Sequence, residues 1–216
     1  MRYKKFEVSK MNHHFSFSNK RKKFYISNIK NIKSRLKNLN NSTFNILNEK
    51  YINKLNSKSL FSDYLPHKSI GYLINRYMKH PIYKYFLYGC FDKNLKLKII
   101  LVTRELIYKN LKAVRILEIV GKNKDIIFAN GLLNNLSKNY EFVDLYSYGI
   151  DDSILKDVGF NNTQDHPKII IPDYFEPYKK ANNDLYCAFK NNFRQKKVRF
   201  FKGDGDQDNP RVIFKN

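Results

Sequence analysis

The sequence predicts an α/β (α+β) fold with a mixed, mostly antiparallel sheet and one parallel βαβ crossover at its centre. The first observation is a pair of apolar runs, AVRILEIVG and EFVDLYSYG, separated by the helical pattern DIIFANGLLNNLSKNY. The second is the aromatic run IYKYFLYGCF, which is followed by a turn and another apolar run, as in a β-hairpin. The third is composition, because 42% hydrophobic and 15% aromatic residues are enough to build a core.

The N-terminal residues 1–60 are dense in Lys, Asn and Ser, and we separate this basic segment from a domain over residues 61–216. In Ile26–Leu39, apolar residues recur at near-helical spacing with lysines between them, which predicts a basic amphipathic helix. A helix of this kind suits a membrane or nucleic-acid surface, but we favour one that covers the edge of a core. A second helix is predicted in Phe44–Leu55. The pair His13-His14 is expected to be solvated rather than to bind a metal.

The next elements are a helix and a hairpin. Pro66 suits the first turn of a helix within residues 61–79, and His80-Pro81 ends it, because the residue before a proline avoids the helical region. Aromatic residues then fill a predicted strand at 82–91. LKLKIILVTREL is its partner strand across the turn Asp92-Lys93-Asn94.

The central crossover spans Ala113–Phe160 and contains a strand, a helix, a parallel strand and a short helix. After it, IIIP predicts a short strand that ends at Pro172, PDYFEPY an aromatic loop and DLYCAFK a last strand. Ligands of such sheets bind where a strand ends and a helix begins, so a functional site is expected near Gly121–Asp125.

The formal charge is +22, from 41 Lys and Arg against 19 Asp and Glu, and such a charge attracts polyanions. However, Lys is dispersed, and Lys, Asn and Ile dominate while Trp is absent. We therefore attribute the charge chiefly to a composition that AT-rich codons produce. No RNP run or zinc-finger spacing is present, so a nucleic-acid partner is the least favoured.

Cys90 and Cys187 stand far apart in apolar runs, which indicates buried thiols in a reducing compartment rather than a disulfide framework or a metal site. No run is apolar over the roughly 20 residues of a membrane span. The N-terminus shows no apolar secretion signal. A cytoplasmic protein is therefore expected.

Several segments resemble motifs of one protein family. NRYMKHPIYKYFLYG is similar to an Arg-Tyr…His-Pro…Tyr segment, IIIPDYFEP to a strand with a Pro-Tyr-Phe-Glu-Pro loop, and FKGDGDQDNP to a C-terminal Gly-Asp-Gly-Asp-Gln-Asp-x-Pro motif. ILKDVGF looks like a helix that ends in a Gly-Phe pair before the last two strands. These segments resemble GNAT-like proteins, which have the N-acetyltransferase fold, from bacterial surface-polysaccharide gene clusters. The resemblance covers roughly residues 70–210.

The resemblance implies a GNAT-like fold, shortened at its N-terminus, that transfers an acyl group from acetyl-CoA or another acyl-CoA to an amine. The acceptor would be a small-molecule amine, an amino sugar or a sugar nucleotide. The residues that we assign to catalysis are Tyr146, Tyr148 and His166. Those assigned to the cofactor are Val120, Gly121, Lys122 and Lys124. Those assigned to the substrate are Arg76, His80, Asp204, Asp206 and Asp208.

Each assignment has a structural alternative. Lys122 and Lys124 also suit an exposed turn, and Tyr is frequent in this chain, at 16 of 216 residues. Asp165 and His166 point opposite ways on an extended segment. The alternating aspartates from Asp204 onward begin like a calcium loop but lack its Gly and Glu, so no metal is predicted.

Two other functions stay open. The loop Gly121–Asp125 has one glycine, whereas the family's pyrophosphate loop has more, which fits a non-catalytic GNAT-like binding or scaffold protein. A basic nucleic-acid-binding protein is the remaining alternative.

Overall fold

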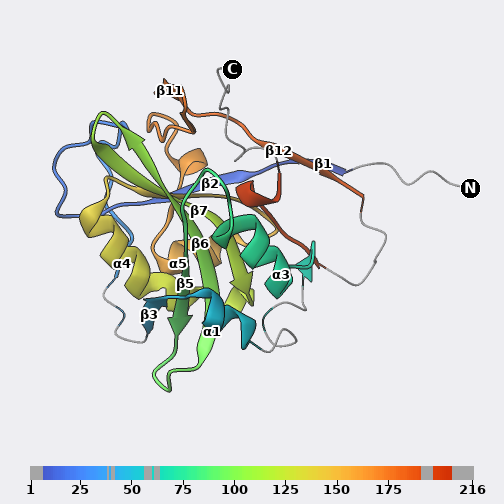
Figure 1. Cartoon of the computed structure of the whole chain (residues 1–216). Helices are drawn as coiled ribbons and strands as arrows, with labels where there is room; N and C mark the ends of the chain where they lie inside the picture. Colours follow the sequence, from blue (N-terminus) through green and yellow to red (C-terminus); the bar gives the residue numbers. More distant parts are fainter. Residues whose placement is uncertain are drawn as a thin grey trace, which may run out of the picture.

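The computed structural model describes residues 7–37, 39, 42–55, 60, 64–190 and 197–205 (Figure 1). One large sheet dominates, with the order β3-β5-β6-β7-β8-β2-β9 and β14 paired with β8. Its strands are β3 (Thr43–Ile46), β5 (Tyr85–Phe91), β6 (Leu97–Tyr108), β7 (Leu111–Gly121), β8 (Val143–Tyr148), β2 (Asn12–Ser16), β9 (Asn161–Asn162) and β14 (Phe200–Phe201). Among the described strands of this sheet, only β7 and β8 pair in parallel. The predicted mixed, mostly antiparallel sheet with a central parallel pair is confirmed.

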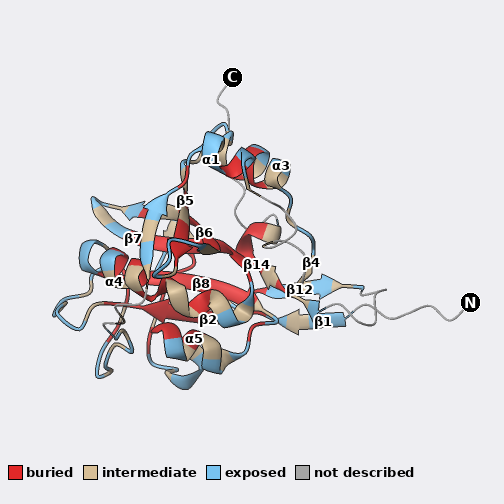
Figure 2. Cartoon of the chain, turned by 90° about the horizontal axis from the view of Figure 1, so that it is seen from below, coloured by how far each residue is buried: buried red, intermediate tan, exposed pale blue. Residues whose placement is uncertain are grey.

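Helical elements cover both faces of this sheet (Figure 2). One face packs against the 3-10 helix η2 (Asn123–Ala129), α4 (Asn130–Asn139) and α5 (Asp152–Val158). The other packs against α1 (Glu49–Asn53), α3 (Ile70–Leu73) and the π-helix η1 (Ile74–Met78). Because both faces are covered, β7 is buried along most of its length, and β6 has a continuous buried run at its centre instead of alternating.

Short elements complete the described fold. Three two-stranded pairs lie outside the large sheet. They are β1 (Glu7–Lys10) with β12 (Tyr186–Phe189), β10 (Tyr174–Phe175) with β11 (Tyr178–Lys179), and β4 (Tyr64–Leu65) with β13 (Lys197–Val198). The 3-10 turns are η3 (Thr163–Asp165) and η4 (Lys202–Asp204).

A β-bulge in β7 decides which side chains share a face. Thr103 of β6 faces Ile116, but the next residue inward, Val102, faces Glu118, so Leu117 is an extra residue in β7. In an uninterrupted strand, Arg115 and Glu118 would point to opposite faces. The bulge turns both toward the face that carries α1, α3 and η1.

The same bulge marks the end of the parallel ladder. β7 and β8 pair from Val114 to Ile116 and then separate. Beyond this point, β8 pairs with β14 through Ser147 and Tyr148. We call the space between the diverging ends of β7 and β8 the notch. Residues near the C-terminus, β14 and η4, fill it.

The helices predicted in the N-terminal residues are largely absent from the part of the chain that the structure describes. The described part of Ile26–Leu39 is not helical. The backbone N–H groups of Tyr25, Ile26 and Ser27 instead donate to the Glu141 carboxylate over 2.8, 3.1 and 2.7 Å. These long-range hydrogen bonds override the local helical pattern.

Three other predicted elements also differ from the structure. Phe44–Leu55 is half strand, because β3 pairs with β5 before Asn48 caps α1. The helix predicted from Pro66 begins at Ile70, since the Ser69 side chain caps it by accepting from the Tyr72 N–H over 3.0 Å. IIIP contributes only an isolated bridge between Asn28 and Ile170.

The remaining elements follow the sequence more closely. The hairpin β5–β6 and the crossover β7–η2–α4–β8–α5 lie where they were predicted. The last predicted strand is β12, but it pairs with β1 and not with the large sheet. Cys90 is buried as expected, whereas Cys187 is only half-buried.

Candidate functional site

The notch is closed by the chain's own Arg199, which lies just before β14. Its guanidinium donates to the carbonyl oxygens of Ile119 over 2.7 Å and of Gly121 over 3.0 Å, both at the end of β7. It also donates to Asn123 Oδ1 over 2.9 Å, at the start of η2. The end of β7 therefore presents carbonyl oxygens to a cation at the place where a phosphate would need backbone N–H groups.

Beside the notch lies a group of polar side chains that we call the Glu118 cluster: Lys68, Tyr72, Tyr77, Glu118 and Asp204. Glu118 is fully buried on β7. The Tyr77 hydroxyl donates to it over 2.6 Å, and Lys68 Nζ lies 2.9 Å from its carboxylate. Lys68 also pairs with Asp204 of η4, and the hydroxyls of Tyr72 and Tyr77 lie 3.4 Å apart.

Burial and the Glu118 charge set the protonation of these groups. Both raise the pKa of Tyr77 far above its ordinary range and that of Tyr72 to about 12, so each hydroxyl remains a donor at neutral pH. Burial lowers the pKa of Lys68, although Glu118 opposes the shift. A cavity of about 20 Å³ borders Glu118, Lys68 and Arg199, which is space for a water molecule.

The cluster is held by close packing of η1 against η4. Arg76, on η1, donates to the carbonyl oxygens of Gly203 and Gly205 over 3.3 Å each. A Cβ on Gly203 would lie 2.7 Å from the Leu117 carbonyl oxygen and closer still to the Tyr77 hydroxyl. Only glycine fits at this position without displacing η4 from the bulge.

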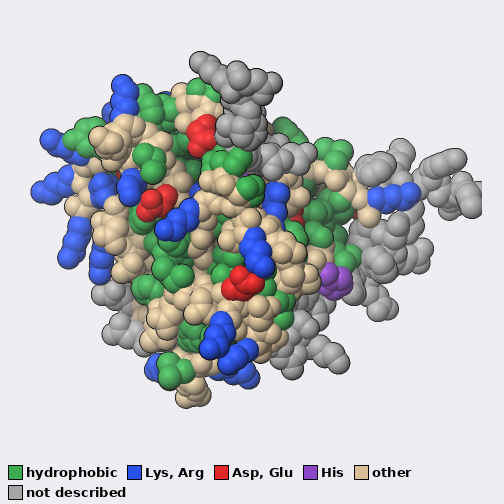
Figure 3. Space-filling model, in the orientation of Figure 1, with side chains coloured by type: hydrophobic (Ala, Val, Ile, Leu, Met, Phe, Trp, Pro, Cys, Tyr) green, Lys and Arg blue, Asp and Glu red, His purple; other side chains and the backbone are tan. Residues whose placement is uncertain are grey.

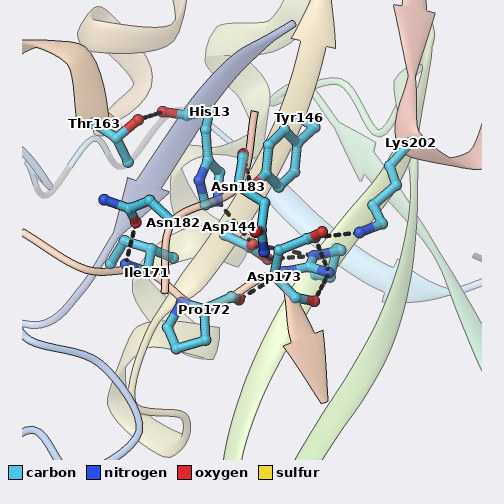
Figure 4. Close-up of polar contacts among 11 residues, drawn as sticks. His13, Asp144, Tyr146, Thr163, Ile171, Pro172, Asp173, Asn182, Asn183 and Lys202 are labelled. Carbon is cyan, nitrogen blue, oxygen red and sulfur yellow. Dashed lines mark hydrogen bonds and ion pairs between the residues drawn. The ribbon is translucent and has the colours of Figure 1, made fainter. Parts of the chain in front are cut away.

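A second buried group, which we call the Arg115 network, comprises His13, Arg115, Asp144, Asp173 and Lys202. Figure 4 labels all of these except Arg115. Arg115 donates to Asp144 through Nε over 3.0 Å and through Nη2 over 2.6 Å. Its Nη1 donates to Asp173 Oδ1 over 2.9 Å, and Lys202 pairs with the same carboxylate. His13 Nε2 lies 3.0 Å from Asp144.

Charges in the Arg115 network balance. Burial lowers the pKa of His13, so the imidazole is neutral at neutral pH. Burial would also raise the pKa of Asp144, but Arg115 reverses this and holds the pKa below its usual range. Burial, with the nearby Arg115 charge, lowers the pKa of Lys202 to about 8. Two cations, Arg115 and Lys202, therefore face two carboxylates, Asp144 and Asp173. Together with His13, these side chains link β2, β7, β8 and η4.

Of the predicted catalytic residues, Tyr146 and Tyr148 share one small apolar cluster, and His166 packs elsewhere. Tyr146 is fully buried, stacks on His13 with ring centroids 3.8 Å apart, and donates to the Asn183 carbonyl oxygen over 3.2 Å. Tyr148 packs against Phe200 of β14. His166 lies next to η3, and its ring meets Phe15 edge to face.

The predicted cofactor and substrate residues do not form one group. Val120 and Gly121 end β7 beside the notch, and Lys122 and Lys124 are exposed at the start of η2. Asp204 belongs to the Glu118 cluster, and Arg76 donates to the carbonyl oxygens of Gly203 and Gly205 on either side of it. His80 instead stacks on Tyr83, and its Nδ1 accepts from two backbone N–H groups. Asp206 and Asp208 lie outside the described residues.

Sequence reasoning missed the residues at the centre of both groups. His13 and His14, expected to be solvated, are buried on β2 and face Asp144 and Asp152. Arg115, Glu118 and Asp144 stand inside the apolar runs AVRILEIVG and EFVDLYSYG. The signal in the sequence was a charged residue inside an apolar run. A charge buried in a strand needs an oppositely charged or hydrogen-bonding partner, so it indicates a polar group in the core.

Comparison with protein-family models, curated proteins and solved structures finds no match for this chain. Among the described residues, no helix is long and apolar enough to cross a membrane, and no three His, Cys, Asp or Glu side chains are grouped for a metal ion.

Proposed function

We propose that the chain is an N-acyltransferase that moves an acyl group from an acyl-CoA thioester to the amine of a small acceptor. The observation that carries this proposal is the bulge at Leu117, which separates β7 from β8 and turns the Glu118 carboxylate to the notch side. Bulges often re-aim a side chain next to an active site. The motifs that resemble GNAT-like proteins favour an amino sugar or sugar nucleotide as the acceptor.

In this proposal the amine nitrogen attacks the thioester carbonyl carbon, the C–S bond breaks, and the amine proton goes to Glu118. A water molecule in the adjoining cavity of about 20 Å³ can relay that proton. Tyr72, protonated at neutral pH because its pKa is raised to about 12, donates a hydrogen bond to the leaving thiolate. An acyl-CoA would enter the notch only when β14 and η4 leave it.

One observation favours a second candidate, a non-catalytic GNAT-like binding or scaffold protein. β14 and η4 occupy the notch, and Arg199 covers the carbonyl oxygens at its end. With the notch filled by the chain itself, no space is left there for an acyl-CoA, which fits a protein without transferase activity.

Calorimetric titration of the full chain with acetyl-CoA tests the first candidate. We expect binding by the wild type and tighter binding by Gly203→Ala, because the added methyl group displaces η4 from the notch. Glu118→Gln is expected to retain binding and to transfer acetyl groups to glucosamine about 100-fold more slowly. If neither the wild type nor Gly203→Ala binds millimolar acetyl-CoA, the enzyme proposal is wrong and the scaffold remains.

A further inference from the structure

A basic groove lies away from the notch, between the loop that precedes Ile26 and the C-terminal half of α4. Two adjoining hollows of about 500 and 340 Å³ share Ser18, Lys20 and Lys138. The cations that line them are Lys20, Arg21, Lys22, Lys23 and Lys138. No Asp or Glu is among the described lining residues. Figure 3 shows Lys and Arg side chains gathered at this edge of the molecule. Hollows of this volume suit a small molecule.

The loop of the groove is fixed rather than loosely attached. Its turn is tied to Ser34, whose backbone N–H donates to Asn19 Oδ1 over 2.8 Å. At its other end, the Tyr25 N–H donates to Glu141, and the Tyr25 carbonyl oxygen accepts from Lys180 over 3.0 Å. The Glu141 carboxylate accepts three backbone N–H bonds and the Ser27 hydroxyl, which hold the loop in place, and Glu141 does not line the groove.

Polar groups in the groove lack partners among the described residues. Ser137 is fully buried at the groove, and its hydroxyl makes no hydrogen bond there. The Arg21 Nε is buried and equally unpaired. None of the five cations forms an ion pair within the described part of the chain. Unpaired buried donors are costly, and phosphate oxygens would accept from them.

We propose that this groove binds a nucleotide, with its phosphates on the cations and its base stacked on Tyr25. Tyr25 is 59% exposed although its backbone is held at both sides, which makes its ring a ready stacking surface. The last turn of α4 carries partial negative charge, which Lys138 offsets there. The site is separate from the notch and does not depend on acyl transfer.

The test is calorimetric titration of the full chain with ADP, without acyl-CoA, since that cofactor also contains an adenine nucleotide. We expect ADP to bind and the double variant Lys20→Ala/Lys22→Ala to lower its affinity about tenfold or more. The matched control is Lys30→Ala/Lys33→Ala, which removes two exposed lysines of the same segment outside the groove. It should change the affinity little.

Tyr25→Ala separates the base from the phosphates. It should weaken ADP but leave inorganic pyrophosphate unaffected, because only ADP has a base to stack. Equal losses in the two lysine pairs would overturn the proposal, since they would mean attraction by net charge alone. Failure of both ADP and pyrophosphate to bind at millimolar concentration would do the same. A short single-stranded RNA that binds far more tightly than ADP would overturn it in favour of a nucleic-acid surface.

Discussion

The Arg115 network and the Glu118 cluster lie on the same face of β7, yet they differ in how their charges are matched. Arg115 and Lys202 face two carboxylates, and all four side chains are buried. In the Glu118 cluster, Lys68 pairs with both the Glu118 and the Asp204 carboxylates, and a cavity adjoins it. A fully matched network holds strands together. A carboxylate that shares its cation beside a cavity is a better candidate for proton transfer.

The largest expected effect comes from breaking the matched network. Arg115→Met leaves Asp144 buried without a cation and Asp173 with Lys202 alone, which should lower the free energy of unfolding by about 3–5 kcal/mol. Urea denaturation measures this loss. Arg35→Met is the control, because Arg35 is exposed and should cost little. A loss below about 1 kcal/mol for Arg115→Met would contradict a structural role for the network.

The next effect is a pH dependence that Lys202 should cause. Its pKa in the folded protein is about 8, below the ordinary value of 10.5. Between these two pH values the unfolded chain binds more protons, so the free energy of unfolding should rise with pH, by at most about 3 kcal/mol. Urea denaturation across this window measures the rise.

Lys68 also has a lowered pKa, so it contributes to the rise in the wild type and in Lys202→Met alike. The difference between the two proteins therefore gives the contribution of Lys202. We expect the variant to show a clearly smaller rise than the wild type. The same rise in both would mean that Lys202 is not held as an unfavourable buried cation.

The parts of the fold that the sequence predicted are those whose hydrogen bonds are local or between adjacent elements. The hairpin β5–β6 and the crossover from β7 to α5 are of this kind. β2 is different, because it pairs with β8 across most of the chain, and His13 and Asp144 are 131 residues apart. No local pattern in the N-terminal residues identifies a partner strand that lies so far away in the sequence.

The candidate site was predictable only in part for a related reason. Arg76 and Asp204 were predicted, and the packing of η1 on η4 places Arg76 against the residues that flank Asp204. Glu118 was not selected, because its place on the face of Arg115 depends on the bulge at Leu117. Strict alternation would place Glu118 on the opposite face, and a one-residue bulge leaves no clear mark in an apolar run.

The smallest expected effect compares two buried tyrosines, one beside each group. Tyr77→Phe removes a hydroxyl that donates to the Glu118 carboxylate over 2.6 Å, and bonds to charged groups contribute about 1.5–3 kcal/mol. Tyr146→Phe removes one that donates to the neutral Asn183 carbonyl over 3.2 Å, which contributes about 0.5–1.5 kcal/mol. Each variant controls for the other, because both lose one hydroxyl from a buried ring, and urea denaturation gives both losses. Equal losses would mean that the Glu118 hydrogen bond is no stronger than a neutral one, and the contrast between cluster and network would not hold.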